Sequence, residues 1–276
     1  MRLAAVPLVL LGAGSLPVAG SGIAEVEDVV PRAPSAREII ERSREHWNRY
    51  DISVRMRIQV FGRTGRSFEQ SLETARVRFD SVSRVLIRMT EPPDLRGTRL
   101  LVIEKSNAPD ERFIYLPSSR RVRRIAAVQA GDRFLGTDFS YEDIGSVDLD
   151  RWVYERLPDE DWNGVSCYVV ESRVKDRTSR VEGRRTWVSR AAFVVLRVDY
   201  TRRGRITRRL TVAPTELEEF APGAFLPRRL VMRSLGRGTR TEISLEEIGR
   251  AEGLPREMFT LGRLQRLNER LLLQAP

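Results

Sequence analysis

The feature that most constrains this chain is a long series of short segments in which apolar and polar residues alternate. In the first segment, every second residue from Ile52 to Val60 is apolar and the residues between them are polar. This is the pattern of a strand with one apolar and one polar face. Most connections are short and no helical segments alternate with the strands, so we expect a mainly β fold built on an antiparallel sheet. The expected strands are residues 52–60, 68–79, 84–90, 98–104, 112–116, 121–125, 152–157, 165–173, 184–189, 193–200, 206–212, 228–234 and 239–247.

So many antiparallel strands must either close into a barrel or curve around something that covers the concave side. Ser35 and Glu38 have the spacing of a capping box, which predicts a covering helix over residues 36–49. The inner residues of the strands would then line an apolar pocket or fill a solid core, and the pattern leaves both open. The inward parity of the second strand shifts near Thr74 and Ala75, which predicts a bulge. A terminal helix is expected from the leucine stripe Leu261, Leu264, Leu267 and Leu271.

The first residues have the composition of a secretory signal peptide. Arg2 is followed by the apolar run Leu3 to Leu11 and then by small residues suited to cleavage. No later stretch approaches the roughly 20 apolar residues of a membrane span. We therefore expect a signal peptide at residues 1–24, a flexible leader at 25–34 and one domain at 35–276, exported to the periplasm. Cys167 is the single cysteine, which excludes an intramolecular disulfide and favours a buried structural thiol.

The chain is strongly basic, with 48 Lys and Arg against 38 Asp and Glu and a net charge of +10. Such a charge permits nucleic acid, an anionic membrane surface or an acidic protein as partner. Export makes nucleic acid an unexpected partner, whereas peripheral membrane contact stays open. The basic run at residues 120–124 could contact phosphates or lipid head groups. We favour a structural role, in which these arginines pair with the acids of the following loop and fix it: Asp132, Asp138, Glu142 and Asp143.

The sequence offers little for catalysis. His46 is the only histidine, and no Gly-x-Ser-x-Gly motif, P-loop or Gly-x-Gly-x-x-Gly pattern accompanies it. The acids Asp138, Glu142 and Asp143 lack the spacing of a calcium loop. Ser140 and Asp143 instead have the spacing of an N-cap and its third residue, which predicts a short helix. We expect no enzyme activity, no cofactor and no metal.

Aromatic residues in the middle of the chain favour either a pocket wall or a satellite of the core. Together with apolar residues of the first strand, they form the candidate lipid-contacting set, at the cavity or its rim: Val54, Met56, Ile58, Val60, Tyr115, Phe134, Phe139 and Tyr141.

Four motifs carry a resemblance to a known family. They are Pro-Pro-Asp-Leu-Arg-Gly-Thr at 92–98, Tyr-Leu-Pro at 115–117, Arg-Arg-Val-Arg-Arg-Ile at 120–125 and Gly-Thr-Asp-Phe-Ser-Tyr-Glu-Asp-Ile at 136–144. With the signal peptide and the first helix, they resemble the LolA-like outer-membrane lipoprotein-sorting proteins, in the branch associated with exporters of the resistance-nodulation-division class. The resemblance implies a strongly curved, unclosed antiparallel sheet, or incomplete β-barrel. Helices and loops would cover its concave face, which holds acyl chains.

The resemblance predicts a monomeric periplasmic carrier that binds the acyl chains of a lipid or lipoprotein for transfer toward the outer membrane. An inner-membrane exporter is the expected partner. The alternative is a periplasmic regulatory sensor that binds lipid and an anti-sigma factor. Such sensors have a second C-terminal domain, whereas the strands here continue to Glu247, which favours the carrier.

Overall fold

The structure is a computed structural model that describes residues 32–80, 82–105, 108–145, 148–175 and 181–266. Residues 34–276 form one compact unit, and every element described below belongs to it; this is called the second unit because residues 1–33 are assigned separately. The predicted signal peptide and most of the predicted leader lie outside the described residues.

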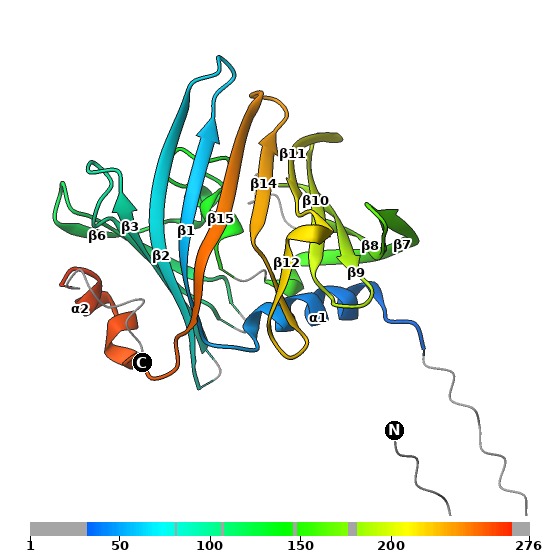
Figure 1. The fold of residues 1–276 in the computed structure, drawn as a ribbon, viewed down its shortest axis with the longest axis horizontal. Coiled ribbons are helices and arrows are strands. Elements are labelled where there is room, and N and C mark those ends of the chain that lie inside the picture. Colours follow the sequence, from blue (N-terminus) through cyan, green and yellow to red (C-terminus); the bar gives the residue numbers. More distant parts are fainter. Residues whose placement is uncertain (1–31, 81, 106–107, 146–147, 176–180, 267–276) are drawn as a thin grey trace, which may run out of the picture. The chain divides into compact units, whose positions relative to one another are not determined.

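The second unit is built on a 13-stranded sheet with the strand order β6-β5-β4-β3-β2-β1-β15-β14-β11-β10-β9-β8-β7. Every neighbouring pair in this sheet is antiparallel, which confirms the predicted mainly β, antiparallel architecture. Figure 1 shows the strands spread from β6 on one side to β7 on the other. These two strands are the edges, so the sheet is not closed. The strands are β1 (Ile52–Phe61), β2 (Ser67–Phe79), β3 (Val82–Glu91), β4 (Arg99–Ile103), β5 (Glu111–Leu116), β6 (Arg121–Arg124), β7 (Trp152–Trp162), β8 (Val165–Val174), β9 (Gly183–Ser189), β10 (Val195–Arg202), β11 (Arg205–Thr211), β14 (Arg229–Ser234) and β15 (Thr239–Arg250).

The alternation of side chains gives the sheet two faces. The inner face carries Val54, Thr74 and Ile87, which are cross-strand neighbours on β1, β2 and β3. The outer face of the same strands carries Ala75 and Leu86, which are also cross-strand neighbours. Because the strand period is two, each residue's register position determines which face its side chain joins.

The predicted bulge near Thr74 and Ala75 is wrong, because β2 pairs with β1 in continuous register through both positions. The apparent parity shift arises because both faces of β2 are buried: Leu72 on the inner face is 3% exposed and Ala75 on the outer face is 0% exposed. The register shifts instead between β2 and β3 at Ser71 and Leu72.

The C-terminal segment covers the outer face beside β2, β3 and β4. Phe259, at the end of a 3-10 helix (Arg256–Phe259), is completely buried and packs edge-on against Phe79 at 5.5 Å. Arg84 donates to the Phe259 carbonyl at 2.7 Å. The expected terminal helix is short, α2 (Leu261–Leu264), with Leu264 buried and Leu261 exposed. The remaining leucines of the predicted stripe, Leu267 and Leu271, lie outside the described residues.

The predicted N-terminal helix is confirmed as α1 (Ala36–Asn48), which Figure 1 shows on the β7 side of the sheet. The Glu38 amide donates to the Ser35 hydroxyl at 3.3 Å, and the Ser35 amide donates to the Glu38 carboxylate at 2.6 Å. The buried Ile39 packs with Tyr168 and Val170 of β8. The capping box thus begins the helix where the spacing predicts, and one apolar face attaches it to the sheet.

The observed strands differ from the expected ones in two places. Strand β7 continues past Leu157 through Pro158 to Trp162, with a register shift at the proline; an edge strand tolerates proline at such a bulge. A separate hairpin, β12 (Leu217–Ala221) and β13 (Ala224–Pro227), was not predicted. Its strands are short and lack sustained alternation, and β12 has two consecutive acids, Glu218 and Glu219, so no strand pattern is visible there.

Candidate functional site

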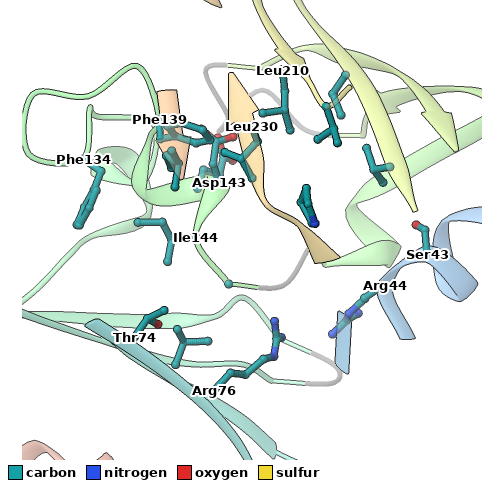
Figure 2. Close-up of a pocket in the computed structure, with 18 of the residues that line it drawn as sticks. Ser43, Arg44, Thr74, Arg76, Phe134, Phe139, Asp143, Ile144, Leu210 and Leu230 are labelled. Carbon is teal, nitrogen blue, oxygen red and sulfur yellow. The ribbon is translucent and has the colours of Figure 1, made fainter. Parts of the chain in front are cut away.

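A cavity of about 470 Å³ lies against the inner face of the sheet. Strands that are far apart in the sheet order, including β1–β3 and β7–β10, contribute to its wall. These strands can surround one cavity only because the sheet curves around it. Figure 2 shows that side chains from the sheet, the end of α1 and the loop at residues 134–145 point into this space.

The wall of the cavity is predominantly apolar. The contributing side chains occupy inner-face positions, as the strand period requires. Leu226 of the β12–β13 hairpin joins them and is buried with Ile52, Val54 and Leu245. The apolar lining residues are Ile40, Ile52, Val54, Met56, Ile58, Leu72, Val85, Ile87, Phe134, Phe139, Ile144, Leu149, Trp152, Tyr154, Val195, Val198, Tyr200, Leu210, Val212, Leu226, Pro227, Leu230, Ile243 and Leu245.

Five residues of the sequence-predicted set lie in this wall: Val54, Met56, Ile58, Phe134 and Phe139. The other three do not line the cavity. Val60 is buried in the neighbouring core cluster, and Tyr141 packs edge-on against Phe134 at 5.6 Å. Tyr115 belongs to the outer-face cluster, where Arg99 stacks over its ring at 5.1 Å. Lipid contact by any of the eight stays a prediction.

We call residues 134–145 the inner loop. Its Asp138 side chain is completely buried and accepts from the hydroxyls of Thr239 and Thr241 on β15, at 2.6 and 3.1 Å. The Asp138 amide donates to the Thr241 hydroxyl at 2.8 Å, and Arg237 donates to the carboxylate at 2.8 Å. These bonds attach the loop to the middle of the sheet.

Asp143 attaches the loop to another part of the sheet. Its carboxylate accepts from Arg208 of β11 at 2.5 Å, and from the amide and hydroxyl of Ser140 at 2.7 Å each. Burial raises the pKa of Asp143, but the charge and hydrogen bond of Arg208 outweigh it, so the net shift is downward. Ser140 is the N-cap of a 3-10 helix at Tyr141–Asp143, which confirms the predicted short helix.

A third attachment comes from the β5 side. Arg112 occupies an inner-face position and donates to the carbonyls of Tyr141 and Ile144, at 2.8 and 3.1 Å. Gly145 then turns the chain with φ of +103°, close to Asp110 and to Val102.

The arginines that bind Asp138 and Asp143 differ from those predicted. Arg237 and Arg208 bind these acids, whereas Arg124 of the basic run pairs with Glu111 at 3.0 Å. Residues 121–124 form the edge strand β6. Strand β6 pairs with β5, and its successive side chains point to alternate faces of the sheet. The acids Asp143 and Asp138 are therefore bound by arginines from elsewhere, Arg208 of β11 and Arg237 of the turn before β15.

Arginine side chains interrupt the apolar wall. Figure 2 shows Arg44 of α1 and Arg76 of β2 with their guanidinium ends turned toward one another. Arg184 of β9 also lines the cavity and stacks over Trp152 at 4.5 Å and over Tyr200 at 5.4 Å. Burial is the main cause that raises the pKa of Tyr154 to about 12, so this phenol stays neutral at physiological pH.

Within the described residues, no three His, Cys, Asp or Glu side chains come together in a way that would hold a metal ion. The His46 side chain lies outside the described part of the structure. Among the described helices, none has the length and apolarity needed to cross a membrane. Cys167 is buried, as predicted, and burial is the main cause that raises its pKa to about 11.

Sequence reasoning missed the arginines of the wall and the contribution of the second half of the sheet. Arg184 and Arg185 are consecutive in a strand, so alternation places them on opposite faces but does not show which face is hollow. The pattern Arg-x-Thr at Arg184 and Thr186 gives no apolar signal, although both residues line the cavity.

Comparisons with known proteins agree with this architecture. A protein-family model described as "Uncharacterized protein" matches residues 81–266. No curated protein matches the chain.

Three solved structures are similar over nearly their whole length. An outer-membrane lipoprotein-sorting protein domain from Vibrio parahaemolyticus is 23% identical, with 82% of this chain and 98% of that chain covered and a TM-score of 0.75. A DUF1329 family protein from Desulfovibrio piger is 22% identical, with 84% and 100% covered and a TM-score of 0.75. A LolA superfamily protein from Nitrosomonas europaea is 18% identical, with 83% and 98% covered and a TM-score of 0.65.

The family match covers more than half of the chain, and the solved structures share its fold. The chain therefore belongs to the family whose model it matches, and its fold is that of the LolA-like outer-membrane lipoprotein-sorting proteins.

Proposed function

We propose that this protein is a periplasmic carrier that holds the acyl chains of a lipid or lipoprotein in its inner-face cavity. It acts as a monomer without catalysis and passes its cargo toward the outer membrane. The observation that carries the proposal is the apolar cavity of about 470 Å³ on the concave face of an unclosed sheet. This volume lies within the range of roughly 300–1,000 Å³ found for ligand pockets.

The energetics of such a wall suit a carrier. Each buried methylene contributes roughly 0.8 kcal/mol, so about ten of them contribute about 8 kcal/mol, which corresponds to micromolar binding. Apolar contacts are not directional, and an acyl chain can therefore leave for a more apolar acceptor without breaking a fixed set of hydrogen bonds. An inner-membrane exporter of the resistance-nodulation-division class is the proposed partner in this transfer.

The direct test is mass spectrometry of lipids extracted from the purified protein, combined with binding of a fluorescent acyl probe. We expect a copurifying lipid and saturable binding. A matched pair of variants on β1 locates the binding site, because Met56 lines the cavity while Arg57 lies on the outer face and pairs with Glu246. Met56→Trp should fill the cavity and weaken probe binding, and Arg57→Trp should leave binding unchanged.

Two results would contradict the proposal. A protein that carries no lipid and binds no acyl probe is not a lipid carrier. Recovery of a single-span anti-sigma factor in a pull-down, in place of an exporter, would assign the cavity to a regulatory sensor.

A further inference from the structure

The charges that line the cavity are unequal. Three arginines contribute to its wall, Arg44, Arg76 and Arg184, against two acids, Glu142 and Asp143. Both acids are bound by arginines from outside the wall: Glu142 lies 3.8 Å from Arg151, and Asp143 lies 2.5 Å from Arg208. The acids of the wall therefore already have cationic partners, and the charge of the wall depends on how its arginines are matched.

Arg76 has a dedicated counter-charge. Its guanidinium donates to both carboxylate oxygens of Glu104, at 2.6 and 2.5 Å, and Glu104 is only 3% exposed. A buried pair of this kind is locally neutral. Arg76 therefore adds polarity to the wall without requiring a ligand.

Arg184 is held differently. It lies in the middle of an inner-face row, between Ser172 of β8 and Tyr200 of β10. Its guanidinium stacks on Trp152 and on Tyr200, and its Nε is buried without a hydrogen-bond partner. Within the described ranges no carboxylate lies within ion-pair distance of this side chain, so aromatic rings position a guanidinium whose charge is not matched by a bound acid.

Asp143 does not supply the missing charge, because it is already bound by other groups. The charge of Arg184 contributes to the lowered pKa of Asp143, which shows that the two groups interact at a distance. However, the Asp143 carboxylate already accepts from Arg208 and twice from Ser140. The Asp143 carboxylate is thus bonded to Arg208 and interacts with Arg184 only through its charge, so the positive charge of Arg184 has no bound acid.

A guanidinium held over aromatic rings in an apolar wall is a suitable receptor for an oxyanion. Its parallel N–H groups match a carboxylate or a phosphate, and the low local polarity strengthens the charge-assisted hydrogen bonds. We propose that the cargo of this cavity is an amphiphile with an anionic carboxylate or phosphate group, and that Arg184 binds this group while the apolar wall binds the acyl chain. The inference rests on the proposed carrier function and specifies the class of its cargo.

The experiment uses the full-length mature protein and a neutral fluorescent probe, N-phenyl-1-naphthylamine, bound in the cavity. Three competitors with the same acyl chain displace it: palmitate, 1-palmitoyl-lysophosphatidate and neutral 1-monopalmitoylglycerol. The last two differ only by the phosphate, and palmitate tests the carboxylate, so the arms distinguish the two sources of the anion. At least one anionic competitor should displace the probe at a concentration about tenfold or more below that of monopalmitoylglycerol, as expected for one hydrogen bond to a charged group.

Substitutions on one strand then identify the residue. R184Q should abolish the preference for the anionic competitor and leave displacement by monopalmitoylglycerol unchanged, which also shows that the variant is folded. R184K keeps the charge but loses the planar fork, so it should retain part of the preference; it also tests the inference if R184Q does not fold. R185Q is the matched control, because Arg185 faces outward and lies 3.9 Å from Glu171, and it should behave as the wild type.

The possible failures are separable. If wild type binds the probe and all three competitors equally, or if R184Q keeps the anionic preference, this inference is wrong and the carrier function stands. If neither the probe nor monopalmitoylglycerol binds, the proposed carrier function is wrong and the assignment of an anionic cargo fails with it.

Discussion

Asp143 is the residue whose loss should most clearly show what holds the inner loop in place. Its side chain is 5% exposed and accepts from Arg208 at 2.5 Å and from Ser140 at 2.7 Å twice. Asp143→Asn removes the charge and leaves Arg208, whose side chain is only 13% exposed, without its carboxylate. Breaking a buried pair from one side costs about 3–5 kcal/mol. The stacking of Arg208 on Tyr200 at 4.4 Å retains some stabilisation, so we expect the lower end of that range.

Urea unfolding followed by circular dichroism measures this loss of free energy of unfolding. Asp150→Asn is the control, since Asp150 pairs with Arg37 at the surface, where an ion pair is worth about 0–1 kcal/mol. The double variant Asp143→Asn with Arg208→Met should be less destabilised than the sum of the single changes, because it leaves no buried charge unpaired. The reasoning is refuted if Asp143→Asn costs no more than Asp150→Asn.

The same pair predicts a dependence on pH. The folded pKa of Asp143 is below its ordinary value of 3.8, so its contribution to stability is complete above that pH. The contribution is lost as the pH falls through the folded pKa, because the unfolded chain then binds the proton more readily. The difference in free energy of unfolding between wild type and Asp143→Asn should therefore be constant near neutral pH and shrink below about pH 4.

Three further predictions concern the rest of the structure. Phe259→Ala should cost about 3–5 kcal/mol in urea unfolding because it empties a fully buried site; the exposed Leu261→Ala should cost little, and equal losses would contradict the packing described. Gly145→Ala should cost more than Gly65→Ala, because an added Cβ at Gly145 meets atoms at 2.8 Å while Gly65 has open space. The Cys167 thiol, with its pKa raised to about 11 chiefly by burial, should not react with Ellman's reagent until the protein unfolds; rapid labelling of the native protein would show that the thiol is accessible.

The alternation of apolar and polar residues predicted most of the sheet, because within each strand it distinguishes the residues of the buried face from those of the exposed face. It failed where both faces are buried, as at Leu72 and Ala75, since burial by the C-terminal segment depends on residues almost two hundred positions away. It also failed for the β12–β13 hairpin, whose short strands are stabilised by contacts such as that of Leu226 with Ile52. Long-range cover leaves no local signal in the sequence.

The candidate site was predictable only in part for a related reason. The apolar residues of β1 and of the inner loop could be predicted as cavity residues, because apolar residues that alternate or cluster can be recognised in the sequence. The cavity arginines could not be selected. Arg184 and Arg185 are consecutive, so each face of this strand has one arginine, and the sequence predicts solvent exposure for both faces. Tyr115 was selected for its aromatic ring, and its position relative to the two faces follows only from the register of β5 with β4.

The inner loop has a mechanical consequence for the open sheet. A closed barrel fixes its own radius through a complete ring of backbone hydrogen bonds, whereas a sheet with two free edges has no such constraint. Here the loop is bonded to β5 through Arg112, to β15 through Asp138 and to β11 through Asp143, so it acts as a tie across the arc. The width of the cavity should then depend on these three polar attachments, and the chemical character of its wall on the side chains between them. If the protein is the carrier proposed above, substitutions of the attachments should change how large a ligand it binds, and substitutions of the wall should change which ligand it binds.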